Sequence, residues 1–350
     1  MADQTPVKRY RILQREVPAM TFAEAVAAGK TIIDVRSPME FAEGGIAGAV
    51  NIPLFDAEER GLIGTLYRHG GREEAVQQGF AVAEGKLESL LAQFAPYRQQ
   101  QLAVCCARGG MRSLSVVNLL NGAGFSACQL RGGYKEYRRG ILERLEAFAP
   151  RLIVIHGLTG TGKTRLLGLL QGAIDLAACA NDRSSLFGAL ERQPSSQRVF
   201  EDRLAGCIVG LGEEPYFIEG ESRKIGRVFI PKPLAMAMKS GVMVQIHCSL
   251  ETRIARILED YPVRDEAVVG QIDAILRSMR RGLGAELVEE MCRLLHRGEL
   301  HELVRLLLVH YYDRRYGKSM SGYRYALELS AEDLSQAAAE LTDFRRSLLP

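Results

Sequence analysis

The chain has 350 residues, of which 47% are hydrophobic and 25% are charged, and its formal net charge is +3. Its length exceeds what one ordinary hydrophobic core holds, so two domains are expected. The near-neutral charge means that any affinity for nucleic acid must come from local patches, and no apolar run is long enough to predict a membrane span.

Residues 1–16 lack the apolar core of a secretory signal and are expected to form an N-terminal extension. The seven cysteines contain no CxxC pair and no Cys/His spacing of a metal site. A scattered, odd set suggests reduced thiols, so we expect a cytoplasmic protein without a membrane partner.

Short apolar strands alternate with helical patterns in the first half of the chain. Strands are expected at 31–35, 49–52, 102–105 and 126–130, followed by a charged helix over 135–148. Alternation of this type indicates a parallel α/β sheet. We expect this first domain to cover 17–146, with Ala149-Pro150 at the boundary.

The segment VCCARGGMRS (104–113) predicts a buried strand that runs into a glycine-rich loop opened by Cys106. A thiol in this position lies inside a ring of backbone N–H groups that can hold an anion or stabilise a thiolate. We expect Cys106 to be catalytic and Cys105 to be a small buried hydrophobe. The arginines of the loop could bind an oxyanion. The residues expected to bind an anion here are Arg108, Gly109, Gly110, Arg112 and Ser113.

The second half opens with an apolar strand, the sequence GLTGTGKT (157–164) and an apolar helical pattern. This is GxxxxGK[ST] in the strand–loop–helix context of a P-loop. The glycines allow backbone N–H groups to face a phosphate chain, and the new helix directs its positive dipole end toward it. Lys163 would reach the terminal phosphates, and Thr164 would offer its hydroxyl to Mg²⁺. The residues expected to bind a diphosphate or polyphosphate are Gly157, Thr159, Gly160, Thr161, Gly162, Lys163 and Thr164.

Two further strands, 215–218 and 242–247, precede a helical pattern over 249–261 and a longer one over 265–309. The second domain, 147–350, is thus expected to be a P-loop NTPase-like α/β domain with a helical C-terminal part. Glu219 and Glu221 follow a strand at the place where P-loop proteins position a metal-binding acid. A role in holding Mg²⁺ and a solvated loop are equally favoured.

The motifs of the first domain resemble those of the rhodanese domain. The resemblance rests on DVRSPMEF (34–41), GGIAGAVNIP (44–53), the Cys106 loop and LRGGYKEYR (130–138). It implies a rhodanese-like parallel-sheet domain that carries sulfur or selenium on Cys106. The six-position spacing between Cys106 and Arg112 is slightly longer than that of the commonest rhodanese loop. For Asp34 and Arg36, a structural hydrogen bond is favoured over direct catalysis.

The pairing of this domain with a P-loop module is more specific. Together with QPS (193–195), FIEGES (217–222) and YYD (311–313), it resembles the tRNA 2-selenouridine synthase family over roughly 17–330. The resemblance implies that selenium from selenophosphate replaces sulfur in wobble 2-thiouridine. It further implies an S-geranyl intermediate made from geranyl diphosphate, for which the P-loop is the expected site. The resemblance implies that Cys106 is the catalytic residue. It also implies that the substrates are tRNAs with Lys, Glu or Gln anticodons and that a selenophosphate-producing enzyme is a partner.

Basic residues interleaved with aromatic ones are the candidates for contacts to tRNA. The favoured segment is 310–316, whereas a charged helix face is the slightly favoured interpretation of 277–281. The polar clusters 182–185 and 193–197 could line a substrate cleft or form turns and caps. The candidate tRNA contacts are Arg277, Arg280, Arg281, Tyr311, Tyr312 and Arg315.

Two other functions stay open at the level of sequence. One is a sulfurtransferase fused to an NTP-dependent kinase or ATPase that acts on a small molecule, and the other is a non-catalytic anion sensor. Whether the P-loop binds an NTP, and whether Cys105 assists Cys106 as a resolving thiol, is equally open.

Overall fold

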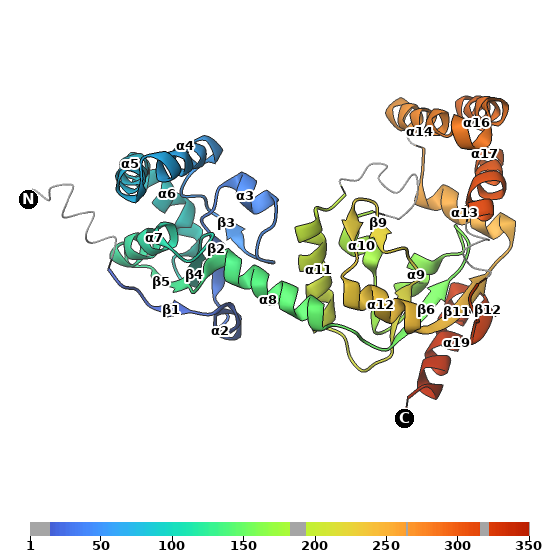
Figure 1. Cartoon of the computed structure of the whole chain (residues 1–350), viewed down its shortest axis with the longest axis horizontal. Helices are drawn as coiled ribbons and strands as arrows, with labels where there is room; N and C mark the ends of the chain where they lie inside the picture. The colour runs from blue at the N-terminus through green and yellow to red at the C-terminus, as the bar shows by residue number, and fades with distance from the viewer. Residues whose placement is uncertain (1–14, 183–193, 264, 316–321, 350) are drawn as a thin grey trace, which may run out of the picture. The chain divides into compact units, whose positions relative to one another are not determined.

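The structure is a computed structural model that describes residues 15–182, 194–263, 265–315 and 322–349 (Figure 1). Its internal contacts divide the chain into two units, Met1–Glu143 and Arg144–Pro350. The division falls within helix α8 (Gly133–Ala147).

The first unit contains a five-stranded sheet in the order β1-β5-β4-β2-β3, and every pair in it is parallel. The expected parallel α/β sheet is therefore confirmed. Strand β4 occupies the centre, where Leu102 is paired with Thr31 on one side and with Ala127 on the other. The strands are β1 (Ala19–Met20), β2 (Thr31–Asp34), β3 (Val50–Asn51), β4 (Gln101–Cys105) and β5 (Ser126–Leu130).

The helices of this unit begin at clear sequence signals. Capping boxes start α2, α3 and α4, in which Thr21, Ser37 and Asp56 accept from the third helical residue and a glutamate bonds back. Ile33 and Val104 of the sheet share one buried core with Phe94 and Leu120 of the helices. The helices are α2 (Phe22–Ala27), α3 (Pro38–Ala42), α4 (Ala57–His69), α5 (Arg72–Glu84), α6 (Leu87–Phe94), η1 (Ala95–Tyr97), α7 (Met111–Gly122) and α8.

The second unit contains another five-stranded parallel sheet, in the order β12-β11-β6-β8-β7, and a small antiparallel hairpin. Strand β6 lies at the centre of the sheet. The strands are β6 (Leu152–His156), β7 (Ala173–Ile174), β8 (Tyr216–Glu219), β9 (Lys224–Ile225), β10 (Val228–Phe229), β11 (Val242–His247) and β12 (Leu327–Ser330).

The helices of the second unit form two buried groups. Leu166 of α9 and Leu341 of α19 pack with Ile153 and Ile155 of β6 in one core. Figure 1 shows α14, α16 and α17 in the other group, which shares Ile254 of α13. The helices are α9 (Lys163–Leu167), α10 (Leu176–Ala180), α11 (Gln197–Val209), α12 (Lys232–Ser240), α13 (Leu250–Asp260), α14 (Glu266–Ser278), α15 (Arg280–Leu283), α16 (Ala285–Arg297), α17 (Leu300–Leu307), η2 (Leu308–Tyr312) and α19 (Leu334–Ser347).

The long helical pattern over 265–309 is not one helix. Gly284 and Gly298 adopt positive φ angles of 88° and 74°, and each separates two helices. Within the part of the chain that the structure describes, no helix has the length and apolar content needed to cross a bilayer.

Candidate active sites

Each of the two candidate loops follows the central strand of its sheet. The Cys106 loop follows β4, and the P-loop follows β6. In open parallel sheets, ligands bind outside the carboxyl ends of the strands, where connections leave in opposite directions. The two loops therefore lie where the fold itself favours a ligand.

The sulfur of Cys106 lies among hydrogen-bond donors. The backbone N–H of Gly110 donates to Sγ at 3.3 Å, and the Ser113 hydroxyl oxygen lies 3.2 Å from Sγ. Cys106 is 3% exposed and Ser113 is fully buried. The Ser113 hydroxyl also donates to the carbonyl of Gly110 at 3.1 Å, so the Gly110 N–H is the donor that the geometry assigns to the sulfur.

Residues outside the loop hold its shape. The side-chain amide of Gln129 on β5 donates to Gly109 O at 3.0 Å, Gly110 O at 3.1 Å and Ser113 Oγ at 2.9 Å. The N–H of Tyr134 donates to the carbonyl of Cys106 at 2.9 Å. Gly133, with φ of 58°, passes so close to Cys106 that a Cβ there would clash with that carbonyl oxygen. Gln129 was not among the predicted site residues.

The two loop arginines have different surroundings. Arg112 Nη1 lies 2.8 Å from a carboxylate oxygen of Glu40, to which Arg60 is also close at 3.5 Å. Burial alone would raise the pKa of Glu40, but the hydrogen bonds and charge of Arg112 lower it to about 2. Arg108 is exposed. The expected cation at the end of the loop is therefore present but paired with Glu40, a residue of the DVRSPMEF motif whose role was not predicted.

Asp34 and Arg36 form a structural pair, as favoured from the sequence. Their side chains are buried and 2.7 Å apart, and the Arg36 guanidinium lies 3.8 Å from the ring centroid of Tyr134. Cys105 is fully buried on β4. Burial first, and then the nearby Asp34 carboxylate, raise the pKa of its thiol well above its usual value. A thiol with these surroundings is a poor nucleophile.

The P-loop is held by arginines from α13. Arg253 Nε donates to the carbonyl of Thr159 at 2.8 Å, and Arg256 Nη1 donates to that of Thr161 at 2.7 Å. Gly160 and Gly162 have φ angles of 85° and 91°, a backbone region that suits glycine. The loop backbone is thus fixed by residues about ninety positions further along the chain.

Three side chains converge at the start of α9. Lys163 Nζ donates to the carbonyl of Gly157 at 2.9 Å and lies 3.5 Å from Glu219 Oε1. The Thr164 hydroxyl donates to Glu219 Oε2 at 3.0 Å. Glu219 is 7% exposed. Glu219, one of the two predicted acids, therefore contacts both P-loop side chains.

His156, the last residue of β6, has an unusual environment. Its ring centroid lies 4.6 Å from that of Tyr323 and 5.9 Å from that of Tyr325. On the other side, a Cβ at Gly220 would lie 2.5 Å from a ring atom. Burial and the charge of Lys163 lower the pKa of His156 to about 4, so the ring is neutral at pH 7. The sequence assigned no role to this histidine.

Comparisons with known proteins decide the family. The family model "tRNA 2-selenouridine synthase AAA domain" matches residues 150–343, and the rhodanese-like domain model matches 19–139. The chain belongs to the tRNA 2-selenouridine synthase family. It is 33% identical to a tRNA 2-selenouridine synthase of Pseudomonas fluorescens over 82% of this chain and 81% of that protein. It is 31% identical to one of Shewanella denitrificans over 87% of this chain and 92% of that protein. A match of 34% identity with one of Nitrosomonas europaea covers 67% of this chain and 64% of that protein.

The side chains expected to contact tRNA differ in their solvent exposure and in whether a carboxylate already pairs with them. Arg277 pairs with Asp273 at 2.6 Å, and Arg280 pairs with Glu289. Tyr312 is 6% exposed and packs within the helical core, so its ring does not face solvent, where an RNA base could stack on it. Tyr311 and Arg315 are joined by a hydrogen bond of 2.8 Å. Residues 183–193 and 316, which complete the polar clusters and the basic segment, lie outside the described residues.

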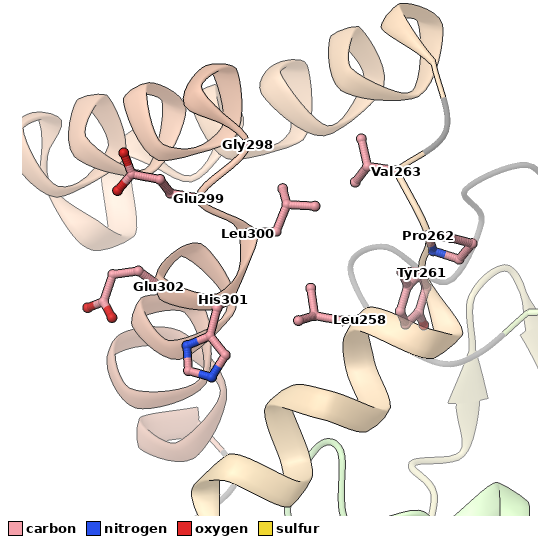
Figure 2. A pocket seen from close by; sticks show the side chains of 9 residues that line it. All are labelled: Leu258, Tyr261, Pro262, Val263, Gly298, Glu299, Leu300, His301 and Glu302. Carbon is pink, nitrogen blue, oxygen red and sulfur yellow. The ribbon is translucent and has the colours of Figure 1, made fainter.

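A separate hollow lies in the helical part of the second unit, between the end of α13 and the start of α17 (Figure 2). Its volume is about 610 Å³. None of the residues that line this hollow is part of the P-loop or is among the other candidate site residues. They are Leu258, Tyr261, Pro262, Val263, Gly298, Glu299, Leu300, His301 and Glu302.

Proposed function

We propose that this chain replaces sulfur by selenium in wobble 2-thiouridine of tRNA, with selenophosphate as the selenium donor. The tRNAs would be those with Lys, Glu or Gln anticodons, and a selenophosphate-producing enzyme would supply the donor. The observation that carries this proposal is that a chain of this family places two different glycine-containing loops after the central strands of its two sheets. One loop presents a thiol, and the other presents a lysine, a hydroxyl and backbone amides.

The P-loop is proposed to bind geranyl diphosphate and to promote transfer of its geranyl group. In this step the bond between sulfur and the allylic carbon forms, the bond from that carbon to oxygen breaks, and pyrophosphate leaves. Lys163 and the loop amides would stabilise the charge that develops on the departing pyrophosphate. The neighbouring Thr164 hydroxyl and Glu219 carboxylate, 3.0 Å apart, are oxygen ligands of the type that would hold Mg²⁺.

The Cys106 loop is proposed to relay selenium to C2 of the base. Alkylation of the sulfur turns a poor leaving group into one that departs as neutral geranylthiol when the C2–Se bond forms. Water cleaves the Se–P bond of selenophosphate and phosphate leaves. Cys106 would assist the attack of the released hydrogen selenide on C2, so that no atom changes its oxidation state. The Gly110 N–H, which donates to Sγ at 3.3 Å, supports a role for this sulfur in handling an anion.

The test supplies purified protein with thiolated tRNA and geranyl diphosphate, with and without selenophosphate, and analyses the nucleosides by mass spectrometry. We expect S-geranyl-2-thiouridine without selenophosphate and 2-selenouridine with it. If neither nucleoside forms, the proposal is wrong. Hydrolysis of ATP or GTP without any need for tRNA would instead favour a sulfurtransferase fused to an NTPase.

A further inference from the structure

The hairpin β9–β10 carries an exposed basic and aromatic surface that neither loop uses. We call Arg223, Lys224, Arg227 and Phe229 the hairpin surface. The three cations are exposed, and the Phe229 side chain is 51% exposed. Figure 1 shows the hairpin in yellow, close to α10 and α11.

The cations of the hairpin surface form no ion pair within the described residues, and the nearby Asp182 carboxylate lies beside Gly226 in the turn. Within the described ranges, neither Arg223 nor Lys224 forms an ion pair with a carboxylate. Arg227 donates to the carbonyl oxygens of Ser195 and Pro194, which position the guanidinium without neutralising it. Arg277 and Arg280 differ, because Asp273 and Glu289 neutralise them.

The aromatic ring is presented by a fixed backbone. The Gln197 side chain accepts from the N–H of Phe229 at 2.7 Å and donates to its carbonyl at 2.9 Å. These two bonds tie β10 to the start of α11, while the ring stays exposed with Lys224 Nζ 5.8 Å from its centroid. An exposed ring beside unpaired cations is the arrangement on which single-stranded nucleic acids stack.

The hairpin follows closely after Glu219, a residue that contacts the P-loop. Glu219, which accepts from Thr164 at 3.0 Å, is five residues before Lys224. Five residues span at most about 17 Å. A nucleotide loop held by the hairpin surface is therefore within a few nucleotides of the proposed geranyl-transfer site.

We infer that the hairpin surface binds the single-stranded anticodon loop of the substrate RNA. Arg223, Lys224 and Arg227 contact backbone phosphates, and Phe229 stacks on a base next to the modified one. This inference rests on the proposed function, because that function makes tRNA the substrate. It assigns the RNA contact to a part of the second unit that sequence patterns did not indicate.

The test measures binding of an anticodon stem-loop RNA by fluorescence anisotropy across a range of KCl concentrations. The slope of log K against log [salt] is negative. The double variant Arg223→Ala/Lys224→Ala is expected to make it shallower by about 1.4, since each lost single-strand phosphate contact removes about 0.7 from its magnitude. Phe229→Ala is expected to weaken binding by roughly 5- to 150-fold without changing the slope, whereas Phe229→Tyr retains affinity. Arg346→Ala is the matched control, because Arg346 is exposed but paired with Asp343 at 2.8 Å.

The outcomes separate the two proposals. Unchanged RNA affinity and salt slope in both hairpin variants, with thermal unfolding like that of the wild type, overturn the hairpin inference even if the wild type modifies tRNA. Loss of RNA binding in these variants supports the inference even if the wild type forms neither modified nucleoside, a result that overturns only the proposed function. Weaker binding of geranyl diphosphate with RNA binding unchanged also counts against the hairpin.

Discussion

The Cys106 loop and the P-loop both lie at the carboxyl edge of a parallel sheet, and we propose that each holds an anion there. Each follows the central strand of five, and each contains glycines with positive φ angles. They differ in what the loop adds. The first adds a nucleophilic sulfur, and the second adds the ammonium group of Lys163 and the hydroxyl of Thr164.

The difference indicates which part of the chemistry each loop can perform. A sulfur within hydrogen-bond distance of an amide and a hydroxyl can form a covalent bond and still be stabilised as an anion. The P-loop presents the ammonium group of Lys163, and we propose that it binds and stabilises a leaving phosphate. In both loops the main cation is already close to a carboxylate, Glu40 or Glu219, at 2.8 Å and 3.5 Å.

The largest effect is expected from Cys106→Ala. Loss of the nucleophile should lower selenium incorporation by at least about 10³-fold, while geranyl transfer by the P-loop changes less than about twofold. Both nucleosides are measured by mass spectrometry in the same reactions. Cys105→Ala is the matched control, and it should retain selenium incorporation because this buried thiol has a raised pKa. Equal loss in a folded Cys105 variant would show that the neighbouring thiol takes part.

The reverse pattern is expected from Lys163→Ala. Geranyl transfer should fall by about 10²- to 10³-fold, the usual effect of removing one group that stabilises transition-state charge. Selenium incorporation into tRNA that already carries the S-geranyl group should be retained. Arg165→Ala is the control, since Arg165 is on the same helix but pairs with Glu259 and Asp260 at 2.7 Å. If Lys163→Ala impairs both reactions equally on their own substrates, the two loops do not divide the chemistry.

The predictability of the fold differs between long and short elements. Both sheets follow from the sequence because the central strands of parallel sheets are continuous apolar runs, as in 102–105 and 152–155. Strands β7, β9 and β10 could not be predicted in this way, because strands of two residues are too short to show a periodic pattern. Strand β12 could not be predicted either, because it is an edge strand with mixed burial and its partner β11 lies about eighty residues earlier.

The candidate sites show the same limit. The glycines, Cys106 and Lys163 lie within contiguous motifs, so their positions could be predicted. Gln129 supports its loop from 16 positions away, and Arg253 and Arg256 support theirs from more than ninety. No local sequence pattern links residues over such separations. The pairing of Arg277 with Asp273 could have been anticipated, because residues four apart lie on one helix face.

A smaller effect is expected from Glu40→Gln, which removes the partner of Arg112. The pKa of Glu40 is about 2 in the folded protein, below the ordinary 4.5, so its contribution to stability is present above about pH 4.5 and is lost as the pH falls toward 2. We expect the variant to lose roughly 2 kcal/mol of unfolding free energy at pH 7. Urea unfolding of both proteins between pH 7 and pH 3 measures this difference, which should shrink at the acid end. The exposed Glu58→Gln is the control, and a difference that stays constant over this range would contradict the ion pair.

The smallest effect concerns His156, which reports the electrostatic surroundings of the P-loop. Its folded pKa of about 4 lies below the ordinary 6.5, so the unfolded chain binds more protons between these values and stability falls as the pH falls through them. Between pH 7 and pH 5.5 the wild type should therefore lose roughly 1 kcal/mol more than His156→Phe in urea unfolding. Because Lys163 contributes to the lowered pKa, saturating pyrophosphate should reduce this extra loss by offsetting the charge of the lysine. The half-buried Glu40–Arg112 pair near Cys106 supplies no such response to pyrophosphate. A shift in the pH dependence of His156 alone would therefore indicate that the diphosphate binds at the P-loop.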